Sequence, residues 1–155
     1  MAPLFCTVLG RKKKLIFGKS AIHSWGLYAA EPIEKEDFVV EYLGEYVREA
    51  VADCREKAYR RAGFGDDYIF RVDNEIFVDA TKRGGLARFA NHCCEPNCYT
   101  RIITAGGKQR IVLYSKERIE IGEEVTYDYK FDEEEDRADA IPCCCGAKRC
   151  RGYLN

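Results

Sequence analysis

The residue type with the clearest chemical potential in this sequence is cysteine, which occurs nine times in 155 residues. Near the end of the chain, Cys143, Cys145 and Cys150 place three thiols within one short segment. Thiolates are preferred zinc ligands, and structural zinc takes four ligands in a tetrahedron. We therefore expect the earlier group around Cys94 to supply the fourth ligand, which would fix the tail to the body of the domain.

Other roles for the cysteines fit the sequence less well. A disulfide framework favours an even number of cysteines in a secreted chain, and the sequence starts without the long apolar stretch of a secretory signal. A redox centre is weaker, because no Cys-x-x-Cys stands at a strand-to-helix junction. Some of the thiols, such as Cys6 and Cys54, are expected to be structural, since free cysteine packs as a small hydrophobic residue.

Three further segments carry residue types that are unusual for an ordinary core. Residues 23–28 contain a glycine after bulky side chains, which allows close approach of the backbone to a ligand. Residues 88–97 concentrate Asn, His, Cys and Pro, and such a loop must satisfy its polar groups, often with a ligand. In the third segment, Tyr127 and Tyr129 alternate, so as a strand they would share one face.

A scaffold must position these segments, and the sequence predicts that this scaffold consists mainly of short strands. Residues 38–43 resemble a strand that ends at Gly44, and residues 119–129 contain further strand-like sequence. Apolar residues recur at helical spacing from position 47, which predicts one helix. Its expected buried face consists of Val47, Val51, Cys54 and Ala58. Two hairpins are expected, one turning at residues 73–74 and the other at residues 105–108.

Length and composition limit the classes of protein that remain. A chain of 155 residues is one domain by length, and 46% hydrophobic with 33% charged residues is ordinary for a globular protein. The net charge of −1 gives no field of one sign, so a general affinity for nucleic acid is not expected. No apolar run approaches the ~20 residues of a membrane span. We expect one β-rich domain with a small zinc-bound cap.

Taken together and in this order, the motifs resemble those of the SET-domain protein-lysine methyltransferases over nearly the whole chain. The family motifs fall on Trp25-Gly26, on Asn91-His92-x-Cys94-x-Pro96-Asn97, on Thr126-Tyr127-Asp128-Tyr129, and on Cys143, Cys145 and Cys150. Residues 20–28, residues 79–82 and the final Leu154-Asn155 look like the Set-one and trithorax/mixed-lineage-leukaemia branch. Trp25 and Cys93 are closer to its Set-one side.

The resemblance implies a mainly β fold with some α structure. It would consist of several small sheets, a pseudoknot and a zinc-bound post-SET cap. It also implies three parts of the chain: an N-terminal extension (1–12), the SET catalytic domain (13–131), and an acidic loop with the post-SET zinc-binding segment (132–155).

The resemblance further implies S-adenosylmethionine as the cofactor, together with one structural zinc ion. The residues expected to hold the cofactor are His23, Trp25, Gly26, Tyr68, Asn91 and His92, with Cys144 and Leu154 closing the pocket from the tail. The expected zinc ligands are Cys94, Cys143, Cys145 and Cys150. Cys144 is disfavoured as a ligand because adjacent ligands would strain the loop, although Cys93 and Cys98 leave room for ligand exchange.

By resemblance, the reaction is an in-line attack of a lysine amine on the sulfonium methyl. Tyr42, Tyr127 and Tyr129 are the candidate catalytic residues, with Tyr68 nearby. An ordinary lysine amine has a pKa of ~10.4, so deprotonation at pH 7 costs about 4–5 kcal/mol, which a dry aromatic channel would lower. The resemblance gives Tyr127 the role of aligning the amine. It places Tyr129 where the family limits the number of methyl groups, which predicts mainly mono- or dimethylation.

The implied substrate is the fourth residue, a lysine, of histone H3. Expected partners are the histone H3 tail, WD-repeat and SPRY-type complex subunits and the nucleosome, in the nucleus, with a monomeric catalytic domain and no membrane. The acidic residues 132–136 could attract a basic tail, although a solvated loop is an equal reading. The alternatives are a methyltransferase for another lysine substrate and a zinc-stabilised chromatin-binding module without catalysis.

Overall fold

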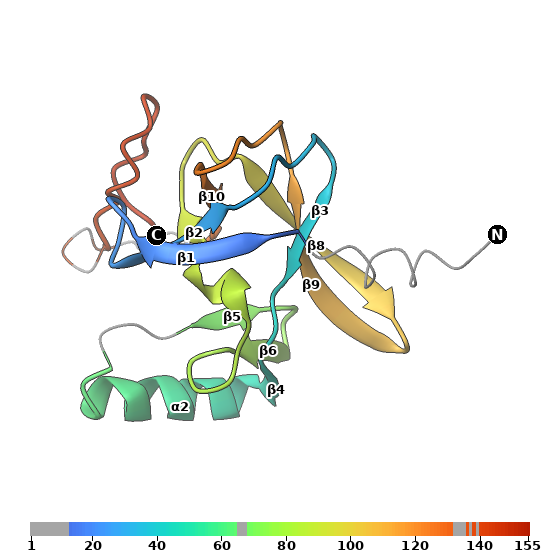
Figure 1. Ribbon diagram of the computed structural model, residues 1–155. Coiled ribbons are helices and arrows are strands. Elements are labelled where there is room, and N and C mark those ends of the chain that lie inside the picture. Colours follow the sequence, from blue (N-terminus) through green and yellow to red (C-terminus); the bar gives the residue numbers. More distant parts are fainter. Residues whose placement is uncertain (1–12, 65–67, 132–135, 137, 139) are drawn as a thin grey trace.

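The computed structural model describes residues 13–64, 68–131, 136, 138 and 140–155, and the domain is built from small sheets (Figure 1). The first sheet has the order β1-β2-β10-β7. Its strands are β1 (Leu15–Lys19), β2 (Trp25–Ala29), β10 (Glu124–Tyr127) and β7 (Asn91–His92). β1 and β2, which the sequence patterns did not indicate, pair antiparallel, whereas β7 and β10 pair in parallel. This sheet brings three motif segments together from distant parts of the chain.

The other two sheets have three strands each, in the orders β3-β9-β8 and β4-β6-β5. The strands of the second sheet are β3 (Phe38–Glu41), β8 (Cys98–Ala105) and β9 (Lys108–Ser115), and those of the third are β4 (Glu45–Arg48), β5 (Ile69–Arg71) and β6 (Ile76–Asp79). Both predicted hairpins are confirmed, as β5–β6 and β8–β9. The longer hairpin turns at Gly106 and Gly107, whose positive φ angles of 62° and 74° suit glycine.

The predicted helix exists, but its predicted buried face is wrong. Helix α2 (Glu49–Arg61) begins after Val47, which belongs to β4, and it buries Ala52 and Tyr59. Val51 is 44% exposed, and Cys54 and Ala58 are exposed as well. The helix packs through a large tyrosine toward β6 rather than through the small apolar residues that set the period in the sequence.

A buried carboxylate connects this helix to the third sheet. Asp79, at the end of β6, is 1% exposed and accepts hydrogen bonds from Arg55 at 2.8 Å and from the Tyr59 hydroxyl at 2.7 Å. It also accepts the backbone N–H of Thr81 at 3.0 Å. A buried charge needs such partners to offset its desolvation. Asp79 therefore fixes α2 over β6.

The core consists of two apolar clusters that meet at partly buried residues common to both. One contains Leu27, Val125 and Tyr127 of the first sheet, and the other contains Tyr42 and Val78 beside the third sheet. Phe70 of β5 packs against both clusters. The boundary between the two clusters is therefore aromatic, and that is where the tyrosine site lies.

Several predicted segments fall outside the described part of the chain. These are the N-terminal extension at 1–12, with Cys6, and the acidic loop apart from Asp136. The predicted pseudoknot stays a prediction. Within the described residues, no helix has both the length and the apolar character that crossing a membrane requires.

Candidate active site and cysteine cluster

Four aromatic residues from three separate segments converge at the boundary between the two core clusters. The rings of Tyr127 and Tyr129 have centroids 4.8 Å apart, and Phe70 stacks on Tyr127 at 6.0 Å. Tyr42 completes the group, 5.2 Å from Phe70. β10 ends at Tyr127, so Tyr129 lies beyond the strand. The two rings are therefore neighbours although only Tyr127 belongs to the strand that the alternating pattern suggested.

The hydroxyl groups of Tyr42 and Tyr127 stay protonated at neutral pH. Burial raises the pKa of Tyr127 well above its ordinary value, and the neighbouring Tyr129 and Tyr42 add to this. Burial also raises the pKa of Tyr42, with Tyr129 as the next contributor. These phenols can therefore orient a polar group by hydrogen bonding and exclude water, but they do not act as strong bases.

The loop predicted to bind a ligand lies directly beside these rings. Asn91 is 6% exposed, and its side-chain amide donates to the backbone carbonyls of Trp25 at 2.8 Å and His23 at 3.4 Å. The Tyr129 hydroxyl donates to the carbonyl of Ala90 at 3.0 Å. The structure thus brings together His23, Trp25 and Asn91, as predicted, and sets them next to Tyr129.

A carboxylate that the sequence patterns did not single out lies at the centre of this arrangement. Glu124 accepts the Asn91 amide at 2.7 Å and the Ser20 hydroxyl at 2.8 Å. Gly26 packs so close that a Cβ there would lie 2.8 Å from the Glu124 Cδ and 2.9 Å from the Ser20 Cβ. A side chain at position 26 would therefore displace Ser20 and Glu124, whereas the predicted close approach of the Gly26 backbone to a ligand stays a prediction.

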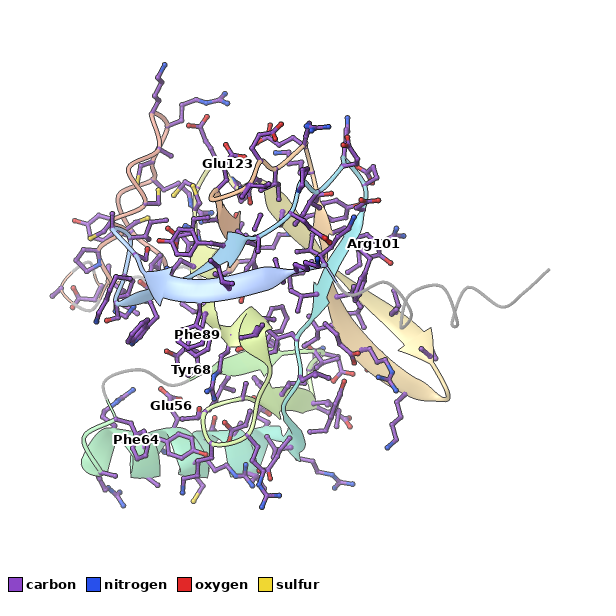
Figure 2. The ribbon with its side chains drawn as sticks, viewed as in Figure 1. Glu56, Phe64, Tyr68, Phe89, Arg101 and Glu123 are labelled. Atoms are coloured by element: carbon purple, nitrogen blue, oxygen red, sulfur yellow. The ribbon has the colours of Figure 1, made fainter. Side chains whose placement is uncertain are left out.

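Tyr68 reaches the same region through a row of aromatic contacts. Its ring lies 6.3 Å from Phe89, and the two are drawn next to each other in Figure 2. Phe89 stacks on Phe17 at 5.1 Å, and Phe17 meets Trp25 edge-on at 5.7 Å. Phe17 and Trp25 are 52% and 40% exposed. This row offers apolar faces beside the Asn91 loop, which an aromatic ligand could cover.

The four cysteines predicted as zinc ligands form one cluster. The ligand atoms of Cys94, Cys143, Cys145 and Cys150 all lie within 4.8 Å of one another. Two separations are 3.8 Å and 3.9 Å, from the Cys94 sulfur to Cys143 and to Cys150. Tetrahedral coordination with zinc–sulfur bonds of ~2.3 Å requires sulfur–sulfur distances of about 3.8 Å. The donor set and its spacing therefore fit zinc.

The thiols differ in how readily they ionise. Burial raises the pKa of Cys145, but hydrogen bonds from the backbone at Cys94 and Ala147 outweigh it and lower the value to about 6. Burial raises the pKa of Cys143. Because zinc binds thiolates, zinc binding to this cluster would displace protons from the thiols that are still protonated.

The four-cysteine cluster does not include Cys98, Cys144 or the tail residue Leu154, and the buried Cys93 lies beside it in contact with Cys145. Cys144 is exposed and outside the cluster, as its adjacency to two ligands predicts, and Cys98 is fully buried. Leu154 is held in the tail by a bond from its N–H to the Ile141 carbonyl at 2.9 Å. In the described part of the chain, no hydrogen bond joins Cys144 or Leu154 to Asn91 or His92.

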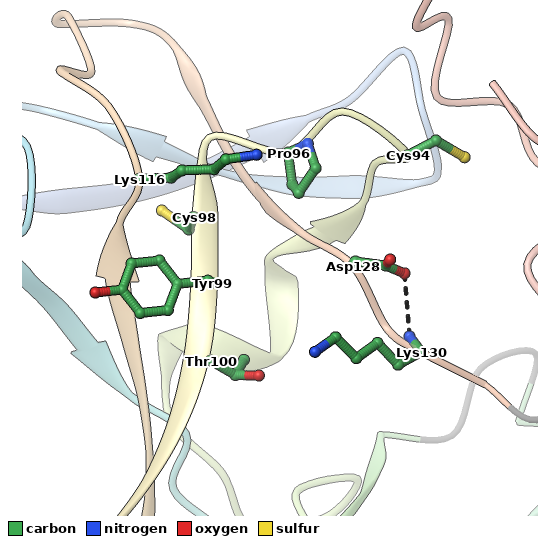
Figure 3. Close-up of a pocket in the computed structure, with 8 residues that line it drawn as sticks. All are labelled: Cys94, Pro96, Cys98, Tyr99, Thr100, Lys116, Asp128 and Lys130. Carbon is green, nitrogen blue, oxygen red and sulfur yellow. Dashed lines mark hydrogen bonds between the residues drawn. The ribbon is translucent and has the colours of Figure 1, made fainter. Parts of the chain in front are cut away.

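A separate hollow of about 390 Å³ has Cys94 in its lining (Figure 3). Its lining residues are Cys94, Pro96, Cys98, Tyr99, Thr100, Lys116, Asp128 and Lys130. It shares Cys94 with the cysteine cluster but contains none of the tyrosines around Phe70. We therefore do not place the chemistry of the aromatic site in this hollow.

The three small sheets, the aromatic cluster beside an Asn-His loop and the four-cysteine tail define a class of protein. The family model for the SET domain matches residues 24–130, and the chain belongs to the SET-domain family. This match lies inside the segment 13–131 that was expected to form the domain.

The curated relatives are histone-lysine N-methyltransferases. The chain is 58% identical over 151 residues to the "H3 lysine-4 specific" enzyme of Schizosaccharomyces pombe, covering 97% of this chain and 16% of that protein. It is 55% identical over 145 residues to human SETD1A, covering 94% and 8%. With the Saccharomyces cerevisiae enzyme, identity is 52% over 145 residues, covering 94% and 13%. The chain thus spans less than one fifth of each of these relatives.

Proposed function

We propose that this chain is a catalytic domain that transfers methyl groups from S-adenosylmethionine to lysine 4 of histone H3. The observation that carries the proposal is an aromatic group beside the Asn91 loop, which consists of the buried Tyr42 and Tyr127 and the half-buried Phe70 and Tyr129. The names of the relatives, over nearly the full length of this chain, support both the reaction and the substrate.

The aromatic group suits the entry of a lysine side chain. Its walls exclude water, which disfavours the charged ammonium and lowers the cost of about 4–5 kcal/mol for deprotonation at pH 7. The protonated hydroxyls of Tyr42 and Tyr127 are close enough to influence each other electrostatically. Alignment of a neutral amine in this channel then contributes most of the rate, because no strong base is present among these side chains.

The contacts support a division of labour between the two tyrosines that reverses the one expected from resemblance. The Tyr129 hydroxyl is fixed by the Ala90 carbonyl, next to Asn91 and on the side where the cofactor would lie. Tyr127 is 5% exposed, and its ring stacks on that of Phe70. We therefore assign alignment of the reacting amine to Tyr129, and restriction of the space for methyl groups to Tyr127.

The residues present fit the expected cofactor. S-adenosylmethionine supplies an electrophilic methyl group when it is bound. Gly26 and the buried Asn91 bring backbone polar groups to the site, and the exposed faces of Phe17 and Trp25 offer apolar surface to an adenine ring. His23, Tyr68 and His92 border the same region. Cys144 and Leu154 would act only as parts of the tail that covers it.

The test is methyl transfer to histone H3 peptides by zinc-loaded protein, read by mass spectrometry. An unmodified peptide is compared with one in which lysine 4 is replaced by arginine, and with peptides that carry only lysine 9. Methylation only where lysine 4 is present supports the proposal. Calorimetry of S-adenosylmethionine binding is the companion measurement. Binding without transfer to any peptide, with the complex subunits added, would instead favour a non-catalytic chromatin module.

The wider setting follows from the same proposal. A histone substrate places the protein in the nucleus, on chromatin. WD-repeat and SPRY-type subunits and the nucleosome are the proposed partners, with a monomeric catalytic domain. Co-purification of a tagged full-length protein from nuclear extract, followed by mass spectrometry, tests this composition directly.

A further inference from the structure

The imidazole of His92 contacts both the cysteine cluster and the tyrosine site. His92 is 3% exposed, and its Nδ1 accepts the backbone N–H of Tyr129 at 3.2 Å. Its Nε2 lies 3.3 Å from the sulfur of Cys94. One buried ring therefore spans the distance between a predicted zinc ligand and the backbone of the aligning tyrosine.

The hydrogen-bond partners define which nitrogen carries the proton. The Tyr129 N–H can only donate, so Nδ1 must be the acceptor and the neutral ring carries its proton on Nε2. That N–H faces the Cys94 sulfur, which accepts it. Arg151 also lies 3.4 Å from Nε2, but its guanidinium donates to the Asp128 carboxylate at 2.8 Å instead. Each polar atom of the ring thus has one assigned partner.

Tyr129 needs this support because the strand does not hold it. The parallel ladder between β7 and β10 ends with Tyr127 opposite His92. Beyond it, Tyr129 is held by the ring of His92 at its backbone N–H and by the Ala90 carbonyl at its hydroxyl. The rings of His92 and Tyr129 are also in edge-on contact, with centroids 5.4 Å apart.

A second connection from the tail reaches the same segment after β10. Arg151 donates its backbone N–H to the Cys94 sulfur at 3.4 Å and its guanidinium to Asp128. The Asp128 carboxylate lies 3.5 Å from Nδ1 of His92, and it accepts the N–H of Lys130 at 3.1 Å, as drawn in Figure 3. The residues on both sides of Tyr129 are therefore connected to the segment that carries the cysteines.

We propose that His92 is a positioning residue that transmits the state of the cysteine cluster to Tyr129. A metal that fits the four thiols would fix the Cys94 sulfur. The Nε2–H bond then holds the ring, and the ring holds the Tyr129 backbone. Hydrogen-bond partners of metal ligands orient those ligands and typically change metal affinity by about 10–100-fold when removed. The role of Tyr129 in aligning the amine rests on the proposed function. The coupling between the cysteine cluster and Tyr129 does not depend on that function.

The experiment uses two variants, each of which retains a polar group at the position of only one of the two ring nitrogens. In His92→Asn, the amide occupies the place of Nδ1 and is too short to reach Cys94. In His92→Gln, the longer amide reaches the place of Nε2. Zinc affinity is measured by competition with a chelator. We expect affinity to fall by about 10–100-fold in His92→Asn and by less in His92→Gln.

The coupling is measured at the tyrosine itself by fluorine NMR. 3-Fluorotyrosine at Tyr129 is expected to shift and broaden when zinc is removed from the otherwise unchanged protein, and to respond much less in His92→Asn. 3-Fluorotyrosine at Tyr99 is the control, because its hydroxyl bonds to Glu36 at the surface of the second sheet and should not respond.

Two results would overturn the inference. One is the absence of a zinc response at Tyr129 in the protein with His92 intact, which needs no variant to fold. The other is a zinc response of the same size in His92→Asn. If Tyr129 responds to zinc through His92 while no peptide is methylated, the proposed function fails and the coupling stands. If peptides are methylated without such a response, only the coupling fails.

Discussion

The rings of Tyr127 and Tyr129 lie 4.8 Å apart and are tilted by 43°, but their environments differ. Tyr127 is buried in the core, whereas Tyr129 is half-buried with its hydroxyl fixed by a backbone carbonyl. Two phenols at one site can therefore serve different purposes, one orienting a reacting group and the other setting the volume of the channel.

This difference predicts opposite effects of removing each hydroxyl. Tyr129→Phe should lower methyl transfer by about 10²–10³-fold, because an oriented hydrogen-bonding group at the reacting centre is lost. Tyr127→Phe should keep turnover and raise the fraction of higher methylation states. Both are measured by mass spectrometry on histone H3 peptides, with S-adenosylmethionine affinity checked by calorimetry. Loss of turnover in Tyr127→Phe, with a product change in Tyr129→Phe, would restore the assignment made from resemblance.

Gly26 and Gly18 form a matched pair for testing the close contact at Glu124, because they are opposite each other in the β1–β2 ladder. A Cβ at Gly26 would lie 2.9 Å from Ser20 Cβ, whereas one at Gly18 would lie 3.6 Å from Tyr28. Gly26→Ala should therefore destabilise the fold by about 1–3 kcal/mol and weaken S-adenosylmethionine binding.

Gly18→Ala should change the free energy of unfolding by no more than about 0.5 kcal/mol. Thermal unfolding and calorimetry give the two measurements. Equal effects of the two substitutions would mean that the approach of Glu124 to the β2 backbone is not what requires glycine at position 26.

Neighbouring cysteines allow the metal site to be tested with little change in composition. Cys145→Ser removes a thiol of the cluster, and Cys144→Ser removes an exposed thiol beside it. We expect Cys145→Ser to lose bound zinc, and its affinity for S-adenosylmethionine to fall about tenfold, or ~1.4 kcal/mol, as the tail loosens. Cys144→Ser should keep one zinc ion per chain. Metal content by mass spectrometry decides; loss of zinc from both variants would contradict the assigned ligand set.

The buried Asp79 predicts a specific dependence of stability on pH. Burial raises its pKa, but hydrogen bonds from Arg55, Tyr59 and Thr81 outweigh this and lower it below the ordinary value of 3.8. The ionised carboxylate therefore stabilises the fold above about pH 4, and this contribution disappears as the pH falls through the lowered pKa of the folded state.

Asp79→Asn should therefore lower stability by about 1–3 kcal/mol at neutral pH, and the difference from the unchanged protein should shrink below about pH 4. Melting temperatures of both proteins, recorded from neutral to acidic pH, measure this difference in stability. Glu56→Gln is the control, since its pair with Arg60 is at the surface and should contribute little. A difference that stays constant as the pH falls would show that the charge of Asp79 is not what stabilises α2.

Much of the site could be predicted from the sequence because its motifs are local. Three features can be recognised from residues that are close in the sequence. They are the spacing of the cysteines in the tail, the turn residues of the hairpin at residues 105–108, and the polar loop at 88–97. The structure gathers the four cysteines into one cluster and places the Asn91 amide on the backbone of His23 and Trp25, while the metal and cofactor roles of these residues stay predictions. The family followed from the order of these motifs, and the match to residues 24–130 supports it.

Only the tertiary structure determined which distant residues become the partners of these side chains. The helix face was wrong because Asp79 and Tyr59, twenty residues apart, determine how α2 packs. Glu124 bonds to Ser20 from 104 positions away, and His92 meets Tyr129 across 37. Residue spacing constrains local geometry, but the pairing of distant strands determines which side chains become neighbours.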